Sequence, residues 1–133
     1  MLTNYAQGQE VNSGSIMEQQ KKTGLLQQMD SGVYYMSTAR YDMANKKFLY
    51  VLKHIKSVPS DLTFYFGKNS LMLGKYKQSI DWLNKYIQLK GTNGQYSEEA
   101  ITLLKEAEAS FLKEHTQDTD VVAEILSKNY DID

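Results

Sequence analysis

Apolar residues recur at helical spacing along most of the chain, and no run shows a convincing strand-like alternation of apolar and polar residues. Ala44, Phe48, Val51 and Ile55 stand at i, i+4, i+7 and i+11, which places them on one face of a helix. The short run 64–66 is strand-like alone, but its place in the repeat described below puts it inside a helix. The pattern therefore predicts an all-α protein.

Six helices are predicted, arranged mostly in pairs. The first begins near Ile16 or Lys21 and ends near Tyr41, and its partner covers 44–56. Pro59 separates this pair from the next, because a proline ring cannot continue a helix, and Ser60 can cap the helix that follows. The remaining helices are predicted over 60–73, from 76 through 87, from 97 through 111 and over 119–128. Gly91 is predicted to turn the chain before residue 97, and the last helix is predicted to bury Val122, Ile125 and Leu126. Residues 1–20 have no sustained period, so we expect a partly disordered N-terminal arm before a helical domain of residues 21–130.

The pattern repeats at an offset of 35 residues, where Gly32 matches Gly67 and Tyr41 matches Tyr76. A glycine in each leading helix lets two helices cross closely, although it costs ~0.5–1 kcal/mol in helix propensity relative to alanine. The positions to which we assign a structural role in the repeat are Gly32, Tyr41, Ala44, Phe48, Gly67, Gly74, Tyr76 and Leu83.

The segment 39–44 with Phe48 and Val51, and the segment 73–76 with Leu83 and Tyr86, resemble the second half of a tetratricopeptide repeat of the bacterial type. The resemblance implies an array of antiparallel helix hairpins, an α–α superhelix. Its repeats would cover about 25–58 and 60–93, with a degenerate third unit at 95–130. Two features depart from the family: Val51 and Tyr86 stand where it has a small residue, and Pro59 falls slightly late.

The leading helices of that family line a concave groove that takes peptides or helices. Carried over position by position, the resemblance assigns the groove to Met29, Val33, Met36, Phe64, Lys68, Leu71, Met72, Glu99, Leu103 and Glu106. Methionine side chains repack easily around varied ligands, which favours an apolar peptide or helix as the occupant. The asparagine with which some family members clamp chaperone tails is replaced by Asp30 and Tyr65.

Composition narrows the function classes. The chain has 133 residues, with 15 Lys and Arg against 16 Asp and Glu, so its net charge of -1 argues against a strongly basic nucleic-acid binder. It has no cysteine, which excludes disulfides and thiolate metal sites within the chain. No segment approaches the ~20 apolar residues of a membrane-spanning helix.

Candidate catalytic chemistry is sparse. His54 and His115 are the two histidines, and neither stands in a metal-ligand motif. Glu98 and Glu99 are neighbours, and neighbours on a helix point in different directions. We therefore predict no catalytic residue, no metal and no cofactor.

These observations predict a non-catalytic scaffold that binds a protein or peptide, with no nucleic acid and no membrane span. The first alternative is a structural or oligomerising segment of a larger bacterial protein. Its groove would be filled by the N-terminal arm, by the last helix or by a second copy in a homodimer. The second alternative, a fragment of an enzyme, requires a cleft with converging ionisable groups. We expect a soluble chain, from the bacterial cytoplasm, periplasm or envelope, and the sequence does not decide among them.

Overall fold

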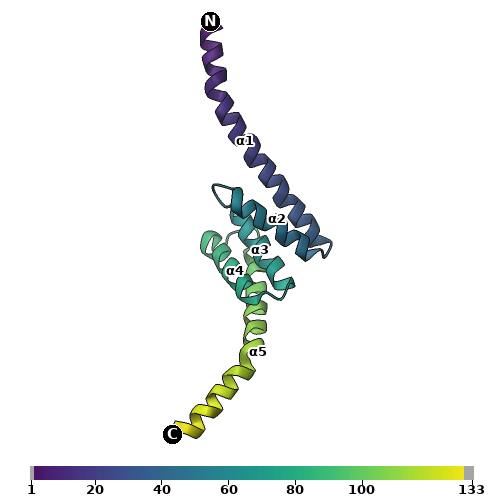
Figure 1. Ribbon diagram of the computed structural model, residues 1–133, viewed down its shortest axis with the longest axis vertical. Coiled ribbons are helices and arrows are strands. Elements are labelled where there is room, and N and C mark those ends of the chain that lie inside the picture. Colours follow the sequence, from purple (N-terminus) through teal and green to yellow (C-terminus); the bar gives the residue numbers. More distant parts are fainter. Residues whose placement is uncertain (1, 131–133) are drawn as a thin grey trace. The chain divides into compact units, whose positions relative to one another are not determined.

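The computed structural model describes the backbone of residues 2–130 and the side chains of residues 13–116 and 123–124. Within this part, the protein is all-α, as predicted, with no strand. Its five helices are α1 (Leu2–Ser37), α2 (Tyr41–His54), α3 (Ser60–Met72), α4 (Tyr76–Lys90) and α5 (Ser97–Tyr130) (Figure 1). The finer prediction, a tetratricopeptide-like arrangement of these helices, stays a prediction.

The chain divides into two compact units, residues 1–62 and 63–133, and the boundary falls in the first turn of α3. In the first unit, α1 packs against α2. In the second unit, α4 packs against α5 and also contacts α3. Each unit therefore contains a helix pair of its own.

The two repeat glycines lie where a leading helix crosses a trailing one. A Cβ atom built on Gly32 would stand 2.5 Å from Cε1 of Phe48, and one built on Gly67 would stand 2.7 Å from Cγ of Leu83. Both neighbours are fully buried, so neither can easily move away. The predicted role of both glycines in close helix crossing is confirmed.

The turn after each leading helix also repeats. Ala39 and Gly74 have positive φ angles of 61° and 73°, the left-handed conformation that ends a helix in a Schellman motif. The backbone N–H of Arg40 donates to the carbonyl of Tyr35 at 2.8 Å, and that of Lys75, 35 residues later, donates to the carbonyl of Ser70 at 2.9 Å. Three further backbone hydrogen bonds recur at the same offset. In the first turn, the N–H groups of Thr38, Ala39 and Ala44 donate to the carbonyls of Tyr34, Met36 and Arg40, respectively. In the second turn, those of Leu73, Gly74 and Ser79 donate to the carbonyls of Asn69, Leu71 and Lys75.

Three predicted boundaries are wrong. The first helix ends at Ser37 rather than near Tyr41, because the left-handed Ala39 turns the chain, and α2 then begins at Tyr41. At its other end, α1 is helical from Leu2, over the segment predicted as an irregular arm. That segment contains glycines but no proline, and its Gln, Glu, Ala and Met residues are good helix formers.

The C-terminal region is also simpler than predicted. One helix, α5, replaces the two helices predicted after residue 97 and the degenerate hairpin they were to form. Residues 112–118 contain neither glycine nor proline, so nothing local interrupts the helix. The side chains of Val122, Ile125 and Leu126, predicted to be buried, lie outside the described residues.

The core of the second unit is aromatic. Phe64, Leu83, Tyr86 and Ala100 are buried together, and half-buried apolar residues pack around them. The Tyr86 hydroxyl accepts a hydrogen bond from the backbone N–H of Tyr96 at 2.8 Å, so it holds the loop that precedes α5. Gly91, predicted to turn the chain after α4, does so with a φ of 58°.

Candidate functional site

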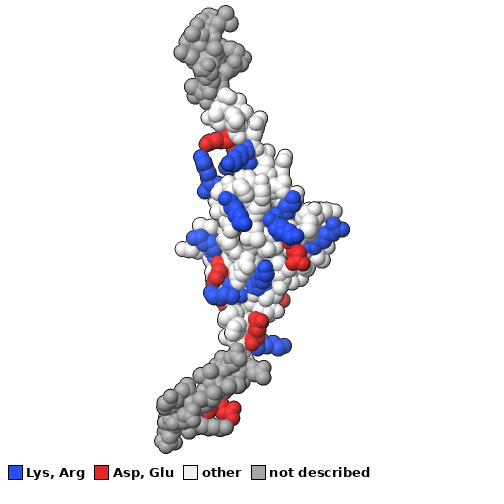
Figure 2. Space-filling view, in the orientation of Figure 1, with Lys and Arg blue, Asp and Glu red and all other residues white. Residues whose placement is uncertain are grey.

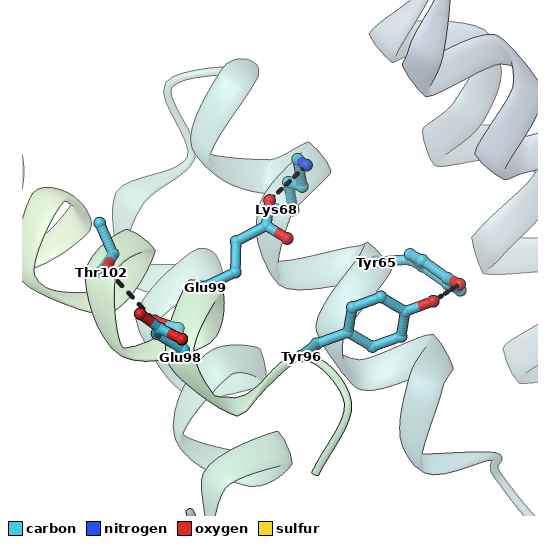
Figure 3. Close-up of polar contacts among 6 residues, drawn as sticks. All are labelled: Tyr65, Lys68, Tyr96, Glu98, Glu99 and Thr102. Atoms are coloured by element: carbon cyan, nitrogen blue, oxygen red, sulfur yellow. Dashed lines mark hydrogen bonds and ion pairs between the residues drawn. The ribbon is translucent and has the colours of Figure 1, made fainter.

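Some of the predicted groove residues of the second unit meet between α3 and α5. The Lys68 Nζ atom lies 2.6 Å from Oε1 of Glu99 (Figure 3). It also lies 5.9 Å from the centre of the Phe64 ring. The Lys68 and Glu99 side chains are 36% and 45% exposed, so solvent screens the ion pair and the pair adds little stability. It leaves one charge of each sign side by side on this face.

A second polar contact joins α3 to the residue that precedes α5. The hydroxyl groups of Tyr65, on α3, and Tyr96, just before α5, lie 2.7 Å apart and share a hydrogen bond (Figure 3). The Tyr96 ring stacks on Phe64, with 4.4 Å between the ring centres and an angle of 5° between their planes. Thr102 donates to the backbone carbonyl of Glu98 within α5. The two Tyr96 contacts hold the residue just before α5 against α3, and the sequence did not predict them.

Two predicted groove residues do not have accessible side chains. Phe64 is 1% exposed, because its ring is covered by Tyr96 and packs against Tyr86. Leu71 is 9% exposed. Phe64 belongs to the hydrophobic core, and its assignment as a partner-binding residue was wrong. The position lies on the inner face of α3 once α5 packs against it, which helical spacing alone does not reveal.

The other groove residues keep exposed surface. Met72 is 51% exposed, Glu106 is exposed, and Leu103 is half-buried against the aromatic core. On α1, the three predicted residues Met29, Val33 and Met36 are all half-buried. These three belong to the first unit and the others to the second, so a continuous groove across both stays a prediction.

The remaining repeat positions behave as structural residues. Ala44, Phe48 and Leu83 are fully buried. Tyr41 and Tyr76 are half-buried and begin α2 and α4.

Sequence reasoning missed a cleft in the first unit. Its volume is about 510 Å³, and it lies between residues 15–25 of α1 and residues 54–57 at the end of α2 and just after it. Lys56 forms an ion pair of 3.0 Å with Glu18 across it. The hydrogen bond from Lys56, its charge and the charge of Lys21 lower the pKa of the Glu18 carboxyl, although desolvation opposes them. No local sequence pattern links Lys21 to Lys56, because the two residues are far apart in the chain.

A second missed cleft, of about 700 Å³, lies in the second unit between the start of α4 and the middle of α5. Tyr76, Trp82 and Phe111 give it an aromatic lining, and Trp82 stacks on Phe66 with 5.0 Å between ring centres. Lys77 and Asp81, on its edge, form an ion pair within α4. Its charged side chains are of both signs, which indicates no particular ligand charge.

The two histidines have similar surroundings. His54 Nδ1 lies 2.8 Å from the carbonyl of Tyr50, and His115 Nδ1 lies 2.9 Å from the carbonyl of Phe111. Each ring also packs against the aromatic ring four residues earlier. Both are thus engaged with their own helix. Among the described residues, no three His, Cys, Asp or Glu side chains are grouped closely enough to hold a metal ion.

Figure 2 shows charged side chains of both signs scattered over the face in view. No helix in the part of the chain described here combines the length and apolar character needed to cross a membrane. The chain matches no protein-family model, no curated protein and no solved structure.

Proposed function

We propose that the protein is a non-catalytic scaffold that binds a peptide or helix of another protein through the leading helices of its repeated hairpins. The observation that carries the proposal is the repeat itself: two hairpins with the same crossing glycine and the same turn. Stacked helical hairpins produce extended surfaces that other proteins bind.

The exposed residues of the leading helices support this role. Met29, Met36 and Met72 all keep accessible surface while the glycine face of each helix is used for packing. Unbranched methionine side chains adapt to the shape of an apolar ligand. Lys68 and Glu99 would add one polar feature of each sign at the edge of that surface.

The test is affinity capture with a charged residue placed on the proposed surface. Met36→Glu combined with Met72→Glu puts one carboxylate on each leading helix. The control, Met17→Glu combined with Leu112→Glu, also replaces two apolar side chains with carboxylates, at positions that are each 66% exposed on α1 and α5. Partners identified by mass spectrometry are then purified and their affinities measured directly.

The proposal predicts that the groove variant loses at least about tenfold in affinity for a captured partner while the control binds as the wild type does. Circular dichroism checks that both variants remain helical. Equal binding by the wild type and both variants would contradict the proposal.

One observation favours the alternative of a structural or oligomerising segment. The helix α1 has 36 residues and pairs with the 14 residues of α2, while α5 has 34 and pairs with the 15 of α4. Long helices that exceed their partners offer surface to a second copy or to a larger protein. This alternative predicts that the purified chain self-associates and that the groove variant reduces its molecular weight in solution.

A further inference from the structure

The cleft in the first unit has a marked excess of basic side chains. Lys21 and Lys22 approach it from α1, and His54 and Lys56 approach it from the end of α2 and the loop after it. Glu18 is the one carboxylate among its lining residues. Leu25, which is buried, and the half-buried Ile55 give it an apolar portion. A ligand that fits this lining combines negative charges with some apolar surface.

The cleft already favours a carboxylate in its charged form. Lys56 donates a hydrogen bond to Glu18, and Lys21 adds a second favourable charge, so the Glu18 pKa is lowered. Lys21 and Lys22 are both exposed and follow each other on α1. Three lysines against one glutamate leave the site with positive charge to attract further carboxylates.

The same chain carries a segment of complementary charge. Residues 117–133 contain five acidic residues and a single lysine, Lys128. The helix α5 continues through Tyr130, and at about 1.5 Å per residue it extends far beyond the length that the 15-residue α4 can cover. The acidic residues are Asp118, Asp120, Glu124, Asp131 and Asp133.

We propose that the basic cleft of one copy binds the acidic C-terminal segment, residues 117–133, of a second copy. The inference does not depend on the proposed groove, because it involves different residues. If each copy gives its segment to the other, the contact closes into a symmetric dimer, whereas one-way exchange builds a chain of copies. Both arrangements depend on exposed charges, which salt screens.

Charge reversal of each side, followed by mixing, tests the proposal on the full chain. One variant reverses the cleft with Lys21→Glu and Lys22→Glu. The other reverses the segment with Asp118→Lys and Asp120→Lys. A control, Lys85→Glu and Lys90→Glu, makes the same charge change at two exposed positions on α4. Sedimentation velocity measures the mass of each over a range of concentrations.

The wild type and the control are expected to self-associate. Self-association of the wild type should weaken about tenfold or more in 1 M salt, and each reversed variant alone should associate about tenfold or more weakly than the wild type. Mixing the two reversed variants restores a complex, because each now offers a complementary partner. A folded wild type that is monomeric at every concentration overturns the proposal. Docking of the segment onto the cleft of its own chain would give this monomeric result and would therefore also overturn it. Equal loss of association in the control, or no complex in the mixture, also overturns it.

The neutral variant Lys21→Gln and Lys22→Gln covers the case in which charge reversal disturbs folding. Circular dichroism reports the helix content of every variant. A neutral variant that remains helical and associates as strongly as the wild type contradicts the proposal, while weakened association supports it.

Discussion

The two hairpins, α1–α2 and α3–α4, share a backbone path and differ in the side chains that fill it. Each trailing helix buries one aromatic and one aliphatic residue three positions apart, in opposite order: Phe48 and Val51 in the first, Leu83 and Tyr86 in the second. The exchange keeps a large and a smaller residue in each hairpin.

The order of the two residues has a consequence for the helix that follows. Because the aromatic residue of the second hairpin is at position 86 and is a tyrosine, its hydroxyl reaches the loop before α5. Its ring packs with Phe64 and Tyr96. The second hairpin also has Ser79 where the first has Ala44, and the Ser79 hydroxyl donates to the Gly67 carbonyl at 2.7 Å. The second hairpin therefore combines the shared crossing with one polar contact between its own helices and one to the loop before α5.

The largest effect is expected from filling a crossing. Gly67→Leu should destabilise the protein by about 3 kcal/mol, because the Leu83 side chain and its backbone nitrogen, 3.2 Å from the added Cβ, leave no room. Gly32→Leu meets the Phe48 ring and should also destabilise. Thermal and urea unfolding followed by circular dichroism measure both.

The matched control is Gly24→Leu, where a Cβ meets nothing within 4 Å. This change should stabilise the helix by about 0.5–1 kcal/mol, since glycine is a poor helix former. A similar loss of stability in all three variants would show that the crossing is not what the glycines provide.

Removing the Tyr86 hydroxyl comes next in size. Tyr86→Phe keeps the ring but leaves the Tyr96 N–H without its acceptor, which should cost about 1–2 kcal/mol. Tyr34→Phe, at a side chain that is 64% exposed, should change stability by less than about 0.5 kcal/mol. Denaturant unfolding measures the difference, and equal effects in the two variants would argue against the proposed lock on the α5 loop.

The smallest effect compares the two turns directly. Ala39 adopts the left-handed conformation that Gly74 adopts without strain. Ala39→Gly should therefore stabilise the protein, and Gly74→Ala should destabilise it by about 1 kcal/mol. Unfolding curves of the two variants should shift in opposite directions, and a shift in the same direction would contradict the shared turn.

Features set by local spacing could be predicted from the sequence. The repeat offset, the crossing glycines and the helix that begins at Ser60 follow from patterns within a few turns of helix. The length of α5 could not, because the two helices predicted over 97–111 and 119–128 are in fact continuous and no glycine or proline lies between them. The extent of α1 was missed because a helix can form where the apolar period is weak.

The candidate site was harder to predict because it depends on packing between distant segments. Phe64 was assigned to the groove, but Tyr96, 32 residues later, stacks on its ring and buries it. The basic cleft likewise joins Lys21 to Lys56, which no local pattern relates. Lys68 and Glu99, assigned to one groove by their repeat positions, do lie in contact.

The crossing is tested most directly by a double-mutant cycle between Gly67 and Leu83. A Cβ at residue 67 would stand 2.7 Å from Cγ and 2.8 Å from Cδ2 of Leu83, and Leu83→Ala removes both atoms. Gly67→Ala should therefore destabilise the wild type but cause little or no further loss in the Leu83→Ala protein, with a coupling of about 1–3 kcal/mol. Additive effects of the two substitutions in urea unfolding would contradict the claim that this glycine exists to admit the facing helix.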